Sequence, residues 1–453
     1  MKHFETSGLW YPSDDPDNAV GGTLKFDDKG LQLALLGAFR QGWSQEAERY
    51  HLIRGVTGKS PYGSFVTLID NFRLGQTFNT AGATTEKIMS HLALVGDFHL
   101  LDGPVHVEKL ILGYSYLNEW VGKGGIEFEH GRSGDGLTFV ITYTKPKDAR
   151  FPFGDKTLTL GFNLEVPRKL HHASIAEDAA IVIEPVGDIT AETLIQDQVR
   201  TIQDLISFAT DTPNAVEEIT FRGEKDERGI APKLHLIYDP VFRLGEKKES
   251  LYPNDMLFTY ADCQAHEFNI FQRWLDFSQK HRAFCEVYFG YTYSSPRYAD
   301  DRLVKAVSAF TLLCSNLVPR SDRTTDFLAD VKTAMRVRYS EEERAYLEPL
   351  MLTGPEIETP IRLLELLEEN SDLMGQVIED FPGFVRSVVD TIDFFERREE
   401  GGRPALGGGD LHYTVEKIKM LIKILVLKEL GFGQDASKSF IERNKQLNHL
   451  KMV

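Results

Sequence analysis

The chain has 453 residues, 42% of them hydrophobic and 11% aromatic, and these fractions exclude an intrinsically disordered protein. A chain of this length is expected to form about two or three domains. Its formal net charge of −17 argues against a protein that coats DNA or RNA non-specifically, because binding to phosphates needs a net-positive face.

Residues 1–250 predict a β-rich domain, folded as a sandwich or a barrel. Short segments rich in β-branched and aromatic residues are separated by clusters of Gly, Asp, Asn and Pro, which are typical of turns. The expected strands are 31–39, 65–72, 87–100, 109–117, 137–144, 156–166, 179–187, 217–223 and 233–242. One helix is expected at 191–209, where apolar residues recur at helical spacing.

Residues 251–453 predict an all-α domain. The composition changes near 245–265, and from there the pattern is amphipathic and helical almost to the end. The expected helices are 266–290, 299–317, 326–339, 340–352, 357–370, 381–398, 411–431 and 435–450. The predicted fold class is therefore α+β, with a β-rich N-terminal domain of sandwich or barrel type followed by a helical domain.

The cysteines and the apolar segments predict the compartment. The three cysteines, Cys263, Cys285 and Cys314, are odd in number and sparse, which indicates a reducing compartment without a disulfide framework. We find no secretory signal and no apolar run of the roughly 18 residues that a membrane helix needs. We therefore expect a cytoplasmic protein with no membrane partner. Matching pairs of Cys and His ligands are absent from the sequence, so neither a metal nor a cofactor is expected.

Three arginines in the helical half are candidate RNA contacts, namely Arg336, Arg338 and Arg397. Arg336 and Arg338 belong to the densest basic patch in this half of the chain. Such a patch can be a solvated helix face or a surface that faces RNA, and the sequence leaves both interpretations open.

The last predicted helix contains Arg443 and, six positions later, His449. The spacing R-x4-6-H marks HEPN-type ribonucleases. With 26 Arg and 13 His in the chain, about two such spacings are expected by chance. Two are present, Arg228–His235 and Arg443–His449. Asn444, directly after Arg443, strengthens the second match. On a regular helix, however, residues six apart point about 120° away from each other, so they would converge only through a helix break or across a dimer interface.

Several segments, taken in order, resemble a known family over nearly the whole chain. The first half resembles the N-terminal domain of ApeA-like anti-phage proteins in 8–37, 107–122 and 194–213, and the second half resembles the Apea-like HEPN domain in 271–289, 388–402 and 421–432.

This resemblance implies a function in abortive infection. In such proteins the HEPN domain would dimerise and cut RNA without a metal, and tRNA is one candidate substrate. A histidine would act as acid or base on the ribose 2′-hydroxyl, and an arginine would hold the phosphate. The N-terminal domain would sense a phage-derived protein trigger. In this chain the candidate catalytic residues are Arg443 and His449, because they form the one Arg-Asn…His set in the sequence of the helical half.

The chain departs from the family pattern on the helix that normally carries the Arg-Asn…His motif. The Arg position is Ile392, the Asn position is Asp393, and the His position falls near Arg397. Ile392 also continues an apolar stripe, so we expect it to face the core. Two hypotheses follow. Either catalysis is carried by Arg443 and His449, or the helical domain is a degenerate nuclease that serves as a phage sensor or a dimerising scaffold.

Overall fold

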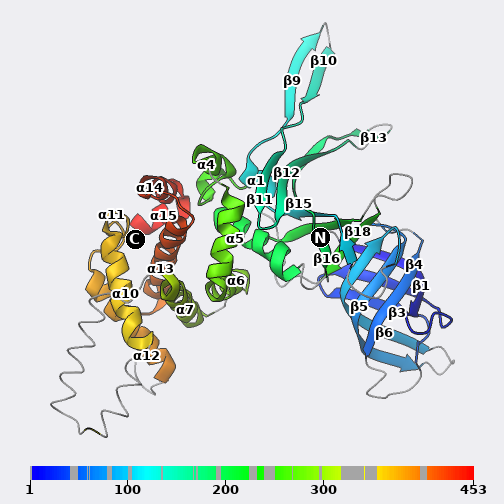
Figure 1. Ribbon diagram of the computed structural model, residues 1–453, viewed down its shortest axis with the longest axis horizontal. Helices are drawn as coiled ribbons and strands as arrows, with labels where there is room; N and C mark the ends of the chain where they lie inside the picture. The colour runs from blue at the N-terminus through cyan, green and yellow to red at the C-terminus, as the bar shows by residue number, and fades with distance from the viewer. Residues whose placement is uncertain are drawn as a thin grey trace. The chain divides into compact units, whose positions relative to one another are not determined.

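The computed structural model describes residues 3–40, 49–58, 60, 62–78, 84–99, 105–133, 136–166, 168–169, 172–189, 195–223, 232–238, 250–267, 269–294, 298–317, 341, 355–397 and 406–452 (Figure 1). The chain divides into two compact units, Met1–Leu251 with Thr259–Gln272 and Tyr252–Phe258 with Arg273–Val453. Strands dominate the first unit and helices the second, which confirms the predicted α+β class.

Six antiparallel strands of the first unit close into a barrel. They are β1 (Phe4–Pro12), β2 (Val20–Asp27), β3 (Gly30–Leu35), β4 (Arg49–Thr57), β5 (Phe65–Phe78) and β6 (Thr84–Gly96). Around the barrel the order is β1–β2–β3–β6–β5–β4, and the pairing of β4 with β1 completes the ring. Because closure pairs the edge strands with each other, the barrel needs no other cover for its edges.

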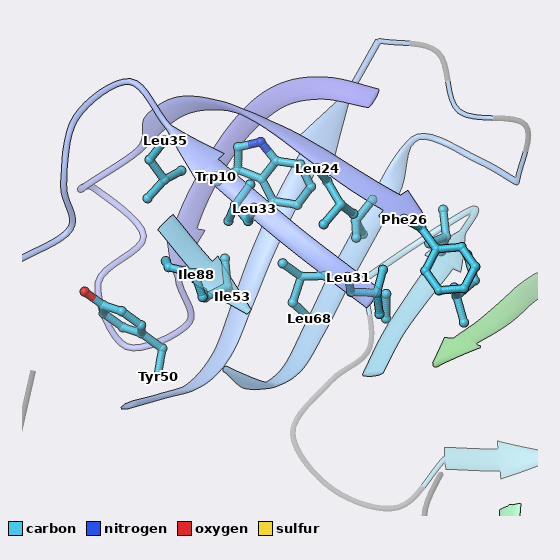
Figure 2. Packing of buried hydrophobic residues seen from close by; sticks show 14 of the residues in the cluster. Trp10, Leu24, Phe26, Leu31, Leu33, Leu35, Tyr50, Ile53, Leu68 and Ile88 are labelled. Atoms are coloured by element: carbon cyan, nitrogen blue, oxygen red, sulfur yellow. The ribbon is translucent and has the colours of Figure 1, made fainter. Parts of the chain in front are cut away.

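Apolar side chains from all six strands fill the barrel. Figure 2 shows Trp10, Leu33, Leu68 and their neighbours gathered in one cluster. The Trp10 side chain is fully buried, and its Nε1 donates a hydrogen bond to the carbonyl oxygen of Gly22 at 3.0 Å. The indole therefore fills the interior without leaving its one polar group unpaired.

The sequence predicts β3, β5 and β6 but misses β1, β2 and β4. In β1 and β4 the buried residues alternate with exposed ones, many of them charged or small. Strands β2 and β4 also contain glycine, which has low β propensity. These glycines lie beside the Trp10 side chain, at Gly22 and Gly55, so the packing of one large residue determines the composition of its neighbours.

The barrel continues into a second antiparallel sheet through β6. One edge of β6 pairs with β3 up to Ser90 and with β18 (Lys233–Tyr238) from Leu92 onward. From β18 the sheet continues through β17 (Val216–Arg222), β8 (Lys109–Tyr114), β15 (Ala176–Glu184), β12 (Lys156–Glu165) and β11 (Ala149–Phe153).

The remaining described elements of the first unit are short strand pairs and helices. The pairs are β9 (Ile126–Ser133) with β10 (Gly136–Tyr143), β13 (Arg168–Lys169) with β14 (His172–Ala173), and β7 (Val105–Val107) with β16 (Gly187–Ile189). The helices are α1 (Leu117–Val121), α3 (Arg200–Ala209), which follows a π-helical turn at Ile195–Val199, and α4 (Tyr260–Ala265). Helix α3 lies within the predicted helix at 191–209.

A polar network around Asn214 attaches α3 to the start of β17. The Asn214 side chain is fully buried; its Oδ1 accepts a hydrogen bond from the Tyr116 backbone N–H at 3.0 Å. The backbone carbonyl oxygen of Asn214 accepts a hydrogen bond from Gln203 Nε2 at 2.7 Å. Because buried amides are costly when unpaired, these bonds fix the position of the helix on its strand.

The side chain of His235 predicts a pH dependence for the first unit. Its Nδ1 lies 3.0 Å from Thr220 Oγ1, and burial, aided by the charge of Lys233, lowers the pKa of His235 to about 4 against the opposing charges of Glu218 and Asp97. A lowered histidine pKa adds stability that is complete above the unfolded value of about 6.5 and is lost as the pH falls towards 4. Across that interval we expect this residue to account for roughly 3 kcal/mol of unfolding free energy.

Chemical denaturation at several pH values measures this dependence. The His235→Gln variant, which cannot gain the proton, is expected to lose less stability on acidification than the unmodified protein. Equal losses in the two proteins would contradict the prediction.

The second unit is helical. Its described elements are α5 (Ile270–Lys280), whose first turn falls in the first unit, α6 (Arg282–Ser294), α7 (Ala299–Leu317), α10 (Pro355–Glu369), α11 (Ser371–Met374), α12 (Phe381–Arg397), α13 (Gly408–Glu429), α14 (Gln434–Arg443) and α15 (Lys445–His449), with 3-10 turns at Pro253–Asp255 and Leu450–Met452. None of the described helices combines the length and apolarity that crossing a membrane requires.

Two predicted helices are each divided in the structure. The expected helix at 266–290 is interrupted at His281, whose fully buried ring lies 3.5 Å from Glu429 at the end of α13. The neighbouring Lys280 also pairs with Glu429, at 2.9 Å. The expected helix at 435–450 is interrupted at Asn444. The predictions at 326–339 and 340–352 fall, apart from Glu341, outside the described residues.

Candidate functional site

Arg443 and His449 lie at the ends of two successive helices. Arg443 is the last residue of α14 and His449 the last of α15, and between them the backbone of Asn444 is extended, with φ −71° and ψ 119°. Arg443 and His449 therefore do not lie on one regular helix, so the separation of about 120° that a regular helix would give them does not apply. The Arg443 guanidinium lies 5.5 Å from the Phe440 ring centroid, while His449 is exposed.

Asn444 has a structural role that accounts for its position. Its side chain is fully buried, and its Oδ1 accepts hydrogen bonds from the backbone N–H groups of Gln446 and Leu447 at 3.0 and 3.1 Å. This is the N-cap of α15, and asparagine is among the preferred residues there. The residue that strengthened the motif in the sequence is therefore explained by capping alone.

On α12 the residues at the motif positions differ from the Arg and Asn of the family pattern. Ile392 is half-buried and Asp393 is exposed, whereas the preceding Thr391 is fully buried. Thr391 Oγ1 donates to the Ser387 carbonyl at 2.7 Å and accepts from the Leu406 N–H at 3.1 Å. An aliphatic side chain and a carboxylate cannot supply the phosphate-binding donors of an Arg-Asn pair.

The candidate RNA contacts contribute no described side chain. Arg397 ends α12, but its side chain is outside the described residues, and so are Arg336 and Arg338. The side chains of Cys263, Cys285 and Cys314 are buried and are not joined in disulfides. Within the described ranges, no three His, Cys, Asp or Glu side chains are grouped as the ligands of a metal ion would be.

The structure shows a polar seam that the sequence analysis missed. It consists of His412, Glu416, Lys419 and Lys423 of α13, together with Tyr291 of α6. The four residues of α13 are spaced at i, i+4, i+7 and i+11, so they follow one face of the helix. This spacing within the segment HYTVEKIKMLIKIL, which is otherwise mostly apolar and has Lys417 as its one further charged residue, is the signal that could have identified the seam.

Contacts across the seam join two helices. Lys419 Nζ donates to both carboxylate oxygens of Glu416, at 3.0 and 3.1 Å, and lies 5.8 Å from the Tyr291 ring centroid. The Glu416 and Lys419 side chains are 23% and 21% exposed, and Lys423 is only 2% exposed. The seam therefore changes from exposed at His412 to buried at Lys423.

Electrostatics determine the protonation states in the seam. Burial by itself would raise the pKa of Glu416, but the charges of Lys419 and Lys423 outweigh it, and the pKa lies below its ordinary value. Burial raises the pKa of Tyr291, with a further contribution from Glu416 and opposition from Lys419 and Arg302. At neutral pH the carboxylate is thus ionised and the phenol keeps its proton.

Comparison with known proteins concerns mainly the first unit. The family model described as ApeA N-terminal domain 1 matches residues 5–274, which is more than half of the chain. The chain belongs to the ApeA N-terminal domain family. The match ends close to Gln272, the last residue of the first unit. No curated protein and no solved structure shows a significant match. Membership of this family indicates an anti-phage defence protein.

Proposed function

We propose that this ApeA-family protein cleaves RNA in the cytoplasm during phage infection, with tRNA as the first substrate to test. In this proposal residues 251–453 form a HEPN-like domain that acts without a metal, as a homodimer, and residues 1–250 receive a phage-derived protein as trigger. Arg443 and His449 are the proposed catalytic residues. The observation that carries their assignment is the helix break at Asn444, which separates them onto two short helices.

The local charge supports contact with RNA. Residues 434–452 contain four basic residues, Lys438, Arg443, Lys445 and Lys451, against two acidic ones, Asp435 and Glu442, in a chain whose net charge is −17. Lys445 is held 3.0 Å from Asp255 by an ion pair. A locally positive segment is the minimum that a phosphate backbone requires.

The two residue types suit RNA cleavage. The imidazole of His449 is exposed and can move a proton to or from a ribose 2′-hydroxyl or a leaving oxygen. The guanidinium of Arg443 can hold a phosphate through two parallel hydrogen bonds and stabilise the negative charge that develops on it. A histidine and an arginine are thus sufficient for proton transfer and charge stabilisation without a metal.

A second function is favoured by α12. Because Ile392 and Asp393 replace the donors expected there, the helical unit could instead be a degenerate nuclease that senses phage or dimerises. This candidate keeps the fold and the partner surfaces but predicts no cleavage of RNA under any condition.

A cleavage assay separates the two functions. The purified full-length protein is incubated with total tRNA, with and without a lysate of phage-infected cells, and in the presence of a chelator. We expect cleavage that resists the chelator and that falls at least about 100-fold in Arg443→Ala and in His449→Ala, since each removes a group acting in the transition state. The matched control is Ser439→Ala, an exposed and uncharged position on α14, which should retain activity.

Cleavage that persists in both variants would exclude this pair as the site. If the unmodified protein leaves tRNA intact with and without the lysate, the degenerate nuclease is the better description.

A further inference from the structure

The hairpin formed by β9 and β10 is a two-stranded sheet with an anchored base. Glu177 of β15 holds this base, because its Oε2 accepts a hydrogen bond from the Gly125 N–H at 2.6 Å and its Oε1 accepts one from the Tyr143 hydroxyl at 3.3 Å. Among the described strands, β9 pairs only with β10, and β10 only with β9. Each strand therefore has an outer edge beside which the described part of the chain places no other strand, and such an edge can accept one.

One face of the hairpin exposes large apolar side chains. Phe128 of β9 lies directly opposite Ile141 of β10, so the two residues share this face. Phe128 is 71% exposed and Ile141 is 50% exposed. A two-stranded sheet by itself is only marginally stable in water, and exposed apolar residues gathered on one face typically mark an interaction surface. The hairpin is therefore a candidate docking surface.

The opposite face of β9 is acidic. Glu127 and Glu129 flank Phe128 along the strand, so they lie on the other face, where both are exposed. Their partners on β10 are the uncharged Thr142 and Val140. A strand added beside β9 would place alternate side chains next to Phe128 and next to the two carboxylates. Apolar residues suit the first set and Lys or Arg the second, because opposite charges on neighbouring strands attract.

A second copy of this chain fits the β9 edge poorly. An antiparallel pairing of two β9 strands centred on Phe128 would set Glu127 of one copy opposite Glu129 of the other, and like charges across strands are destabilising. The exposed apolar area of Phe128 and Ile141 is on the order of 200 Å², against the roughly 800 Å² per partner that a stable complex buries. A short added strand needs less apolar area, because main-chain hydrogen bonds supply much of its affinity.

We propose that the β9 edge of the hairpin binds an extended segment of a partner protein in which apolar residues alternate with lysine or arginine. The backbone of this segment pairs with β9, its apolar side chains cover Phe128, and its cations face Glu127 and Glu129. The anchored base holds the edge in place before binding, which reduces the entropy that binding costs. The proposal does not rest on cleavage of RNA and requires neither Arg443 nor His449.

Fluorescence anisotropy with labelled peptides and the full-length protein tests this edge. The probe is a blocked octapeptide of alternating valine and lysine, and the control peptide has four valines followed by four lysines. Both peptides have the same charge, so the net charge of −17 on the chain attracts them equally. We expect the alternating peptide to bind at least about tenfold more tightly, because only this peptide forms a strand with one apolar and one basic face. Methylation of its backbone nitrogens should abolish binding, since strand pairing needs these donors.

Two double variants link binding to β9. Glu127→Gln combined with Glu129→Gln is expected to raise the Kd of the alternating peptide roughly fivefold or more, because it removes two charge pairs between neighbouring strands. The matched control is Glu5→Gln combined with Asp17→Asn, which removes the same charge at exposed positions outside the hairpin. It should leave the Kd within about twofold, since salt screens charges that are distant from the peptide.

The possible results are separable. Equal binding of the two peptides, or no binding of either, overturns the proposal, and so does an unchanged Kd in the variant without Glu127 and Glu129. Sedimentation of Phe128→Lys beside the unmodified protein tests the second copy, and we expect the two to sediment alike. A dimer that Phe128→Lys dissociates would show that another copy covers the apolar face and would overturn the partner strand. The peptide titration with His449→Ala is expected to give an unchanged Kd, so a failure of RNA cleavage leaves this result intact.

Discussion

Replacing Arg73 by methionine is expected to lower the unfolding free energy of the barrel by about 3–5 kcal/mol, because it leaves a buried carboxylate without its cation. The Arg73 and Glu86 side chains are 1% and 0% exposed, and their Nε and Oε1 atoms are 2.6 Å apart. Glu86 also accepts hydrogen bonds from the Tyr50 hydroxyl at 2.9 Å and from the Phe39 N–H at 3.0 Å. Arg73 in turn donates to the Arg40 carbonyl at 2.6 Å.

Peptide-level hydrogen exchange of the full-length protein measures this effect in β1–β6, because a chain of two compact units need not unfold in one step. The control is the double variant Arg73→Met with Glu86→Met, in which no buried charge remains. We expect it to recover part of the loss but not all, since Tyr50 and Phe39 then lose their acceptor. A single Arg73→Met variant as stable as the unmodified barrel would show that Glu86 is compensated in another way.

The second large effect is expected from Gly55→Val in β4. Gly55 pairs with Trp10 across β1 and β4, and a Cβ atom at this position would fall on Cε3 and Cζ3 of the indole ring. The ring has little freedom to move, since it is fully buried and its Nε1 is bonded to Gly22. Overpacking of this kind in a dense interior is expected to cost about 3 kcal/mol or more.

The matched control is Gly21→Ala in β2, where an added Cβ would meet no atom within 4 Å. It should change the thermal midpoint by no more than a few degrees. In a Trp10→Leu background the further loss caused by Gly55→Val should shrink, because the two changes act on one contact. If both glycine replacements are equally tolerated, the Trp10 contact is not what requires glycine at position 55.

The glycines beside Trp10 illustrate why half of the barrel was missed from the sequence. The strands β5 and β6 contain β-branched residues that form strands in most settings, and in β3 leucines alternate with Gln and Ala. In β2 and β4 the glycines lower the local β propensity. Glycine is needed there because the large Trp10 side chain of β1 leaves no room for a Cβ atom. The closure of the ring is also non-local, because it depends on β4 pairing with β1 across some forty residues of chain.

The candidate site likewise has features that the local sequence predicts and features that depend on the folded structure. The sequence alone proposed Arg443, Asn444 and His449 as candidates and showed Ile392 and Asp393 in place of the expected donors. It could not show that Asn444 is buried as the N-cap of α15, since this depends on where the previous helix ends.

Composition, hydrophobic period and family resemblance by themselves determined the β-rich and helical halves, most of the described helices, and the ApeA-type first unit. These features follow from local preferences that each segment carries with it. Only the tertiary structure decided the barrel closure, the helix breaks at His281 and Asn444, and the polar seam. The break at Asn444 depends on where α14 ends, because the capping bonds of Asn444 to Gln446 and Leu447 are local. The other three depend on a partner distant in the chain: β4 for β1, Glu429 for His281, and Tyr291 for Lys419. Such contacts form only when the chain has folded, and the local sequence does not specify these partners.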